Sequence, residues 1–383
     1  MKLLRAVTPL NSMRSSTATA MPKRFNRFAK TTVADRRRFV ATSIALGTAG
    51  FGSLLATGCR DQDRIVGRDT ADGKSAADGQ RVPVTVQLNW YPEVEHGGVY
   101  QALADGLYSD AGLEVTIRPG GRATNVATEL QMGRAEFAIT NADDVVLGRR
   151  NGGNLIAVAA ACQNSPRCLL VRRDSGIRSW DDSMAGMTLQ RQPGRLYLDY
   201  LRQLGKLDGV NLVPYAGGVT GLTDPKIAIQ AYLFSEPLVA RQSGIDAVPL
   251  MVSELGWNPY SSVLAARDDL VTDRPDLVRK FTDATLAGWR SYLDDPSAGN
   301  AIILQENSEG MTPDALAFGV DQLRTLALVD GMAIEDFGTM SSSRWTTLVE
   351  QIESLTDASS RVTAAECHTL QFCPTLNDGP SKT

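Results

Sequence analysis

The chain has 383 residues, 39 basic and 43 acidic, with a formal net charge of −4. Ten of the basic residues but only one acidic residue lie in the first forty positions, so the part from Cys59 onward carries a formal charge of −13. An acidic body of this kind repels phosphate backbones, which argues against a nucleic-acid partner.

The first 58 residues have the layout of an export signal. Arg36-Arg37-Arg38 precede an uncharged stretch from 41 to 58, as in a twin-arginine signal peptide. That stretch is rich in Gly, Ala, Ser and Thr, so it suits a transient signal better than a permanent transmembrane helix. We therefore expect residues 1–58 to be a signal peptide that is removed on export.

The signal ends at Leu55-Ala56-Thr57-Gly58-Cys59, which resembles the bacterial lipobox, although Ala56 stands where that motif usually has Leu. The resemblance implies that Cys59 is acylated and anchors a periplasmic or cell-envelope lipoprotein to the membrane. The alternative is a soluble exported protein that is cleaved nearby. Residues 59–82 are polar, rich in Gly and Asp and without periodic apolar positions, which predicts a flexible tether.

The four remaining cysteines form two local pairs of identical spacing, Cys162 with Cys168 and Cys367 with Cys373. In an exported protein such pairs favour short-loop disulfides. A metal site is the alternative, because His368 adjoins Cys367. We expect disulfides and no metal, because the chain has only two histidines and no zinc-type spacing.

Strands and helices alternate from residue 83 onward. Residues 84–90 alternate apolar and polar side chains, which indicates a strand with one buried face. The pattern then predicts helices over 98–104, 123–132 and 143–150 and strands over 113–117, 136–140 and 155–161. Such alternation is typical of a mostly parallel sheet with helices on both faces.

A second set of elements follows Val171. It comprises strands at 187–190, 211–215 and 232–234, a helix at 195–204 and a short helix near Ile227. A strand at 261–266 returns the chain to the first lobe, and two amphipathic helices follow. We predict an α/β fold of two doubly wound lobes joined by a hinge, with residues 83–170 and 261–383 in lobe 1 and 171–260 in lobe 2. A ligand cleft is expected between them, at the carboxyl ends of the strands.

Two motifs in the first lobe resemble a known family. The segment 88–100, LNWYPEVEHGGVY, has a strand ending in an aromatic, then x-Pro, a histidine and a small residue that opens a helix, and 106–115 fits the following turn. Weaker similarity covers 133–144, 234–237 and 274–278. The sequence thus resembles the periplasmic binding proteins for thiamine pyrimidine precursors and their sulfonate- and taurine-binding relatives. The resemblance implies the periplasmic-binding-protein fold and a monomer that delivers a small molecule to an ABC permease.

Candidate ligand contacts are side chains expected at cleft-facing strand ends. They are Trp90, Tyr91, His96, Asn141, Asp144 and Glu236. The two aromatic residues can stack on a flat ring, although one of them can equally belong to the core, and the histidine can cap its helix instead of contacting the ligand.

Charge favours a neutral or cationic nitrogen-rich ring, because a desolvated anion beside Asp144 and Glu236 is costly. In the family resembled, the acid equivalent to Glu236 contacts the pyrimidine. Arg122, Arg167 and Arg195 leave a sulfonate- or nitrate-type anion open as the alternative.

The rival hypothesis is an enzyme, because the eukaryotic thiamine pyrimidine synthases share the fold and the opening motif. The resemblance places their Lys and His in the segment that here reads ITNADD (139–144), and their iron-binding cysteine cluster near 255–260. Thr140 and Asp144 replace the amine and the imidazole, and the second segment has no cysteine. Neither a Schiff base to pyridoxal phosphate nor iron ligation is then available. We expect a binding protein with no cofactor and no catalytic residue.

Overall fold

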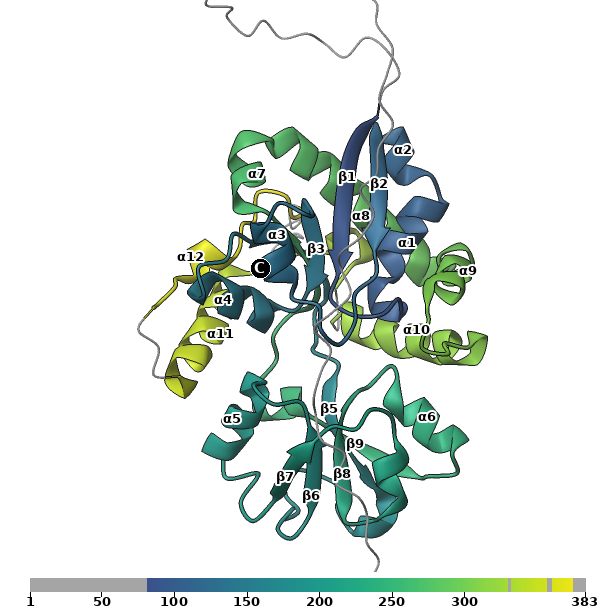
Figure 1. Cartoon of the computed structure of the whole chain (residues 1–383), viewed down its shortest axis with the longest axis vertical. Helices are drawn as coiled ribbons and strands as arrows, with labels where there is room; N and C mark the ends of the chain where they lie inside the picture. Colours follow the sequence, from purple (N-terminus) through teal and green to yellow (C-terminus); the bar gives the residue numbers. More distant parts are fainter. Residues whose placement is uncertain (1–80, 330–331, 357–359, 375–383) are drawn as a thin grey trace, which may run out of the picture. The chain divides into compact units, whose positions relative to one another are not determined.

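The computed structural model describes residues 81–329, 332–356 and 360–374, which contain two five-stranded sheets (Figure 1). The expected signal peptide, Cys59 and nearly all of the expected tether lie outside the described residues. Within those ranges, no helix combines the length and the apolar character needed to cross a membrane.

The first sheet has the strand order β2-β1-β3-β10-β4. Strand β1 (Val82–Leu88) runs parallel to β2 (Leu113–Arg118) and β3 (Phe137–Thr140). Strand β10 (Ser261–Ala266) is antiparallel to β3 and β4 (Ile156–Cys162). Every residue of β3, β10 and the edge strand β4 is buried, as expected for strands that are covered on both faces.

Helices cover both faces of this sheet. In Figure 1, α4 (Ala142–Arg150), α11 (Ser342–Leu355) and α12 (Ala364–Cys367) lie on one side, and α1 (Gly97–Ala104), α9 (Ser297–Glu306) and α10 (Pro313–Ala327) on the other. Helix α8 (Pro275–Asp294) packs directly on α1. A Cβ at Gly98 would lie 2.1 Å from the Trp289 ring, so the glycine permits this close approach. Smaller helices are α2 (Leu107–Asp110), α3 (Val126–Gln131) and α7 (Asp268–Asp273).

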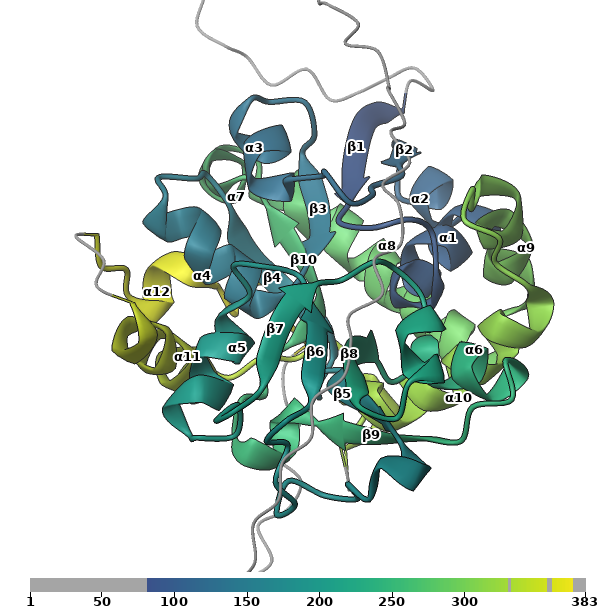
Figure 2. The same ribbon diagram turned by 60° about the horizontal axis from the view of Figure 1, so that its bottom comes forward.

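The second sheet repeats the arrangement in the order β7-β6-β8-β5-β9. Strand β6 (Thr188–Arg191) runs parallel to β7 (Asn211–Pro214) and β8 (Ile227–Tyr232), and β5 (Arg167–Arg172) is antiparallel to β8 and β9 (Ala247–Met251). Figure 2 shows this sheet in front, with α5 (Leu196–Gln203) and α6 (Glu236–Gln242) on either side. The lobe boundary expected at residue 170 falls inside β5.

Most elements agree with the sequence predictions to within a few residues, including the returning strand β10. Two predictions in the second sheet were wrong. The helix expected near Ile227 is the start of β8, and the strand expected at 232–234 includes only the last residue of β8. A short apolar run does not distinguish helix from strand by periodicity. Pairing decides the matter here, because β8 lies between β6 and β5.

The four cysteines of the body are free in the structure, in contrast to the two disulfides expected. Cys162 belongs to the core of the first sheet, where its thiol donates to Ser262 Oγ at 3.8 Å. Cys168 belongs to a separate core on the second sheet. Cys373 donates to the carbonyl of Val158 at 3.5 Å. Cys162, Cys168 and Cys373 therefore each have separate surroundings and contacts in the structure.

Candidate ligand-binding site

A cavity of about 500 Å³ lies where strands of both sheets end. Its walls come from segments that follow β1, β2, β3, β6 and β7, including α3 and α4, and from β5 and β8 and the turn after β8. Its lining includes Asn89, Trp90, Glu93, Glu95, Thr140, Asn141, Asp144, Arg167, Arg195, Tyr215, Tyr232 and Glu236. A second cavity of about 230 Å³ shares Trp90, Glu93, Tyr215 and Glu236 with the first. The two volumes together fall in the range of small-molecule binding sites.

The loop after β1 is held by its backbone. The amide of Gly120 donates to the carbonyl of Trp90 at 2.9 Å. A Cβ at Gly120 would lie 2.3 Å from the carbonyl oxygen of Leu88, so no other residue fits without moving the loop. The rings of Trp90 and Tyr91 meet edge to face, with centroids 5.3 Å apart. Trp90 lines both cavities, whereas Tyr91 lines only the smaller one.

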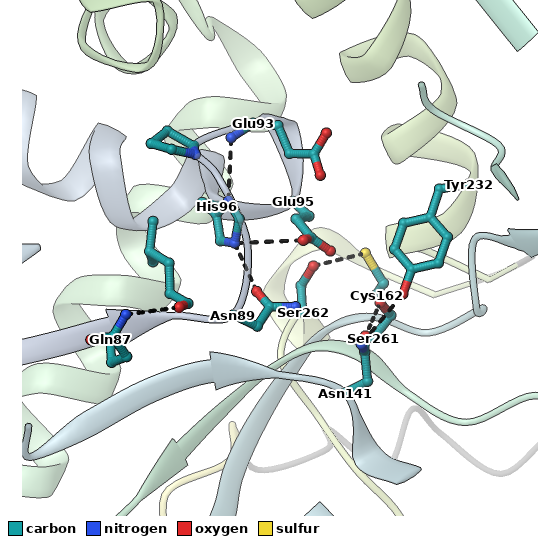
Figure 3. Close-up of polar contacts among 12 residues, drawn as sticks. Gln87, Asn89, Glu93, Glu95, His96, Asn141, Cys162, Tyr232, Ser261 and Ser262 are labelled. Carbon is teal, nitrogen blue, oxygen red and sulfur yellow. Dashed lines mark hydrogen bonds and ion pairs between the residues drawn. The ribbon is translucent and has the colours of Figure 1, made fainter. Parts of the chain in front are cut away.

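His96 holds the loop instead of lining the cavity (Figure 3). It is fully buried at the end of a 3₁₀ turn (Val94–His96). Its Nδ1 accepts from the backbone amide of Glu93 at 3.3 Å, so Nε2 carries the proton and donates to Asn89 Oδ1 at 2.9 Å. Burial lowers the pKa of His96 to about 3, so the ring is neutral. The imidazole thus closes the 3₁₀ turn at Glu93, and it makes no side-chain cap hydrogen bond to α1, the helix that follows it.

Two buried acids in the same turn were missed as site residues. Glu95 is 1% exposed, lines the larger cavity and has its Oε1 3.6 Å from His96 Nε2 (Figure 3). Burial raises the pKa of Glu95 to about 7, and burial together with Glu95 raises the pKa of Glu93 well above its usual range. The sequence signal that could have found them is the pair of acids flanking Val94 within a motif of mainly apolar and small residues.

Asn141 and Asp144 enter the cavity at the start of α4. The Asn141 amide is held on both sides, because its Oδ1 accepts from Ser261 Oγ at 2.6 Å and its Nδ2 donates to the hydroxyl of Tyr232 at 3.4 Å. Asp144 Oδ1 accepts from Arg195 Nη1 at 3.2 Å. This ion pair joins the end of the first sheet to the end of the second.

Arg167 is the most buried cation of the cavity, at 5% exposed. Its guanidinium carbon lies 4.8 Å from the ring centroid of Tyr197 and 5.1 Å from that of Tyr232. Its Nη2 also donates to the Tyr232 hydroxyl at 3.0 Å. Two aromatic faces and one hydrogen bond therefore fix the guanidinium in place.

Glu236 begins α6 and lines both cavities. Its Oε2 accepts from the backbone amide of Tyr232 at 2.8 Å, and its Oε1 accepts from the hydroxyl of Tyr215 at 3.2 Å. Burial raises the pKa of this carboxyl above its ordinary value. Of the six predicted contacts, Trp90, Asn141, Asp144 and Glu236 thus meet at one cavity, and Tyr91 adjoins it.

Comparison with known proteins identifies the family. Residues 93–299, more than half of the chain, match the family described as NMT1/THI5 like. The chain belongs to this family. It is 26% identical over 250 residues to the riboflavin-binding protein of Chloroflexus aurantiacus, which covers 60% of this chain and 68% of that protein. It is 21% identical over 284 residues to the formylaminopyrimidine-binding protein of Halalkalibacterium halodurans, which covers 71% and 84% respectively.

The NMT1/THI5-like chain is also similar to an enzyme. The 4-amino-5-hydroxymethyl-2-methylpyrimidine phosphate synthase of Legionella pneumophila is 21% identical over 246 residues, 60% of this chain and 75% of that protein. Among solved structures, the periplasmic aliphatic sulphonate binding protein of Escherichia coli superimposes with a TM-score of 0.60 at 12% identity, covering 78% of this chain and 94% of that one. The predicted periplasmic-binding-protein fold is confirmed.

The cavity side chains bear on the difference between binding proteins and synthases of the NMT1/THI5-like family. Among the described residues that line it, none is a lysine, a histidine or a cysteine. The donor set consists of carboxyl, amide, hydroxyl and guanidinium groups. Such a set can hold a polar ring by hydrogen bonds, but it offers no amine for a Schiff base and no soft ligand for iron.

Proposed function

We propose that this protein is the solute-binding component of an ABC importer and that it captures a neutral or cationic nitrogen-containing ring compound in the larger cavity. The observation that carries the proposal is the combination of the half-buried Trp90 side chain with buried carboxyls in one cavity. An aromatic side chain can stack on a flat ring, and carboxyl oxygens can accept hydrogen bonds from the ring's N–H groups. The riboflavin-binding and formylaminopyrimidine-binding relatives support this class of ligand.

The N-terminal region supports the cellular setting of this role. A signal over 1–58, a lipidated Cys59 and a tether over 59–82 would hold the binding body at the cell envelope beside its permease. Two lobes, 83–170 with 261–383 and 171–260, would close on the ligand through the two crossings between the sheets. A monomer suffices for this cycle.

A synthase is the second candidate, favoured by the similarity to pyrimidine phosphate synthases of Legionella pneumophila and Saccharomyces cerevisiae. Thr140 at the end of β3 and Asp144 at the start of α4 weigh against it, since neither side chain forms a Schiff base. An anion receptor is a weaker candidate, because Arg195 is paired with Asp144 and the other cavity arginine, Arg167, faces several carboxyls.

Calorimetric titration of the purified protein separates the three candidates. The ligands are riboflavin, 4-amino-5-hydroxymethyl-2-methylpyrimidine, taurine and nitrate. We expect saturable one-to-one binding of at least one ring compound, with the ligand recovered unchanged. Binding confined to taurine or nitrate would support the anion receptor. Pyridoxal absorbance retained on the protein would support the synthase.

A further inference from the structure

Three buried polar atoms at the larger cavity have no hydrogen-bond partner within the described part of the chain. They are Glu95 Oε2, Thr140 Oγ1 and Arg167 Nε. Their residues are 1%, 1% and 5% exposed, and all three line the cavity. Because buried polar groups are nearly always hydrogen-bonded, three unused atoms around one cavity indicate the positions where a ligand bonds.

Three further charged groups of the cavity are already occupied, and the buried carboxyl of Glu93 has no buried atom without a partner. Asp144 is paired with Arg195, and both oxygens of Glu236 accept hydrogen bonds from the protein. Free hydrogen-bonding capacity is thereby concentrated at Glu95, Thr140 and Arg167. The sequence-based contact list contains none of these three.

Glu95 and Arg167 carry complementary groups that are held apart. The Tyr197 and Tyr232 rings fix the guanidinium, and the turn closed by His96 fixes the carboxyl. No ion pair joins Glu95 to Arg167, both of which the structure describes. The positive charge of Arg167 nevertheless opposes the rise that burial causes in the pKa of Glu95. The two charged groups are therefore close enough to interact electrostatically at the cavity.

We propose that Glu95 and Arg167, assisted by Thr140, recognise a ring edge that presents an N–H donor beside a carbonyl or ring-nitrogen acceptor, as in a cyclic amide, a ureide or an aminopyrimidine. The Glu95 carboxylate accepts from the ring N–H, and Arg167 Nε–H donates to the neighbouring acceptor. The Thr140 hydroxyl can serve either group. This inference rests on the proposed function and specifies the polar chemistry of its ligand.

The arrangement discriminates against simpler ligands. A sulfonate or nitrate offers acceptors alone and would bring a negative charge against Glu95. A simple ammonium ion offers donors alone and would leave Arg167 Nε without a partner. A mixed donor and acceptor edge satisfies all three unused atoms at once.

The first test compares two ligands on the unaltered protein. The protein is titrated with riboflavin and, separately, with 3-methylriboflavin, in which a methyl group replaces the hydrogen on the nitrogen between two ring carbonyls. If the protein prefers the aminopyrimidine, that compound is compared with its 4-dimethylamino counterpart. We expect methylation to weaken binding roughly tenfold to a hundredfold, the range for a lost hydrogen bond to a charged group. Equal affinity for both members of the pair would overturn the proposal.

The second test changes the protein. Glu95→Gln keeps the side-chain shape but replaces a carboxylate oxygen with an amide donor, and Arg167→Lys keeps the charge but removes Nε–H. Each is expected to weaken binding of the parent ring compound at least roughly tenfold. The control is Glu350→Gln on the exposed surface of α11, which makes the same chemical change away from the cavity and should bind like the wild type.

The outcomes separate this inference from the proposed function. If the wild type binds a ring compound and Glu95→Gln and Arg167→Lys bind it within twofold, the donor–acceptor recognition is wrong while the receptor role stands. If the wild type binds no ring compound, both fail. Should a variant not fold, as judged by circular dichroism, the comparison of parent and methylated ligands on the wild type decides alone.

Discussion

The two sheets have the same strand order and differ in the side chains they bring to the cavity. In each, three parallel strands are followed by one antiparallel crossing strand, β10 in the first sheet and β5 in the second, and then by an edge strand. The segments after β1 and β3 supply the acids Glu93, Glu95 and Asp144, whereas the second sheet supplies Arg167 and Arg195 together with one acid, Glu236. Both cavity arginines thus come from the second half, and the chemistry depends on a few residues at and beyond the strand ends.

The largest expected effect concerns the buried Glu95 carboxyl, which the first half supplies to the cavity. Burial raises the pKa of Glu95 from 4.5 to about 7, so folding favours its protonated form. Its contribution to the free energy of unfolding is fully present below about pH 4.5 and is lost as the pH rises through about 7. We expect the wild type to lose about 2–3 kcal/mol more than Glu95→Gln between pH 5 and pH 8, measured by urea unfolding without ligand.

Glu93, Asp143 and Glu236 also have raised pKa values through burial, but they remain in both proteins. The difference between the two pH profiles therefore reports the titration of Glu95 together with its effect on Glu93, whose pKa its charge raises. Parallel profiles would mean that the Glu95 carboxyl is solvated and that burial does not raise its pKa.

The next effect concerns the Trp90 side chain, which the first half also supplies to the cavity. Trp90→Ala should weaken binding of the ring compound by about 2 kcal/mol, the usual value for one aromatic side chain stacked on a base-like ring. Tyr91→Ala is the matched control, because Tyr91 lines only the smaller cavity and should affect affinity less. Calorimetry measures both. A larger loss for Tyr91→Ala would place the ring in the smaller cavity and reverse the assignment.

The fold was largely predictable because alternating strands and helices carry strong periodic signals. The apolar runs of β3 and β4 and the alternation in β1 identify the first sheet directly from the sequence. Strand β8 was not predictable in this way, because IAIQAY fits a short helix as well as a strand until β6 and β5 pair with it.

The candidate site was only partly predictable. Trp90, Asn141, Asp144 and Glu236 follow strands directly, so their place at the cavity follows from the fold rule for strand ends. His96 was a candidate ligand contact and Glu95 was not, but the structure shows the opposite. The 3₁₀ turn directs the imidazole toward Asn89 and places the Glu95 carboxyl at the cavity. Residue type within a motif does not reveal which of two neighbours faces inward.

The smallest expected effect tests the direct link between the two halves. Asp144 Oδ1 and Arg195 Nη1 are 3.2 Å apart, and their side chains are 29% and 33% exposed. An ion pair with this solvent access contributes at most about 1 kcal/mol. A double-mutant cycle with Asp144→Asn and Arg195→Gln should give a coupling energy of this size in the unfolding free energy, declining in high salt because mobile ions screen accessible charges. A coupling above about 2 kcal/mol would mean that the pair is desolvated and forms a fixed latch between the halves. A coupling near zero would mean that the ion pair does not hold the two halves together, leaving that role to the crossing strands, to contacts such as the Asn141–Tyr232 hydrogen bond and to the bound ligand.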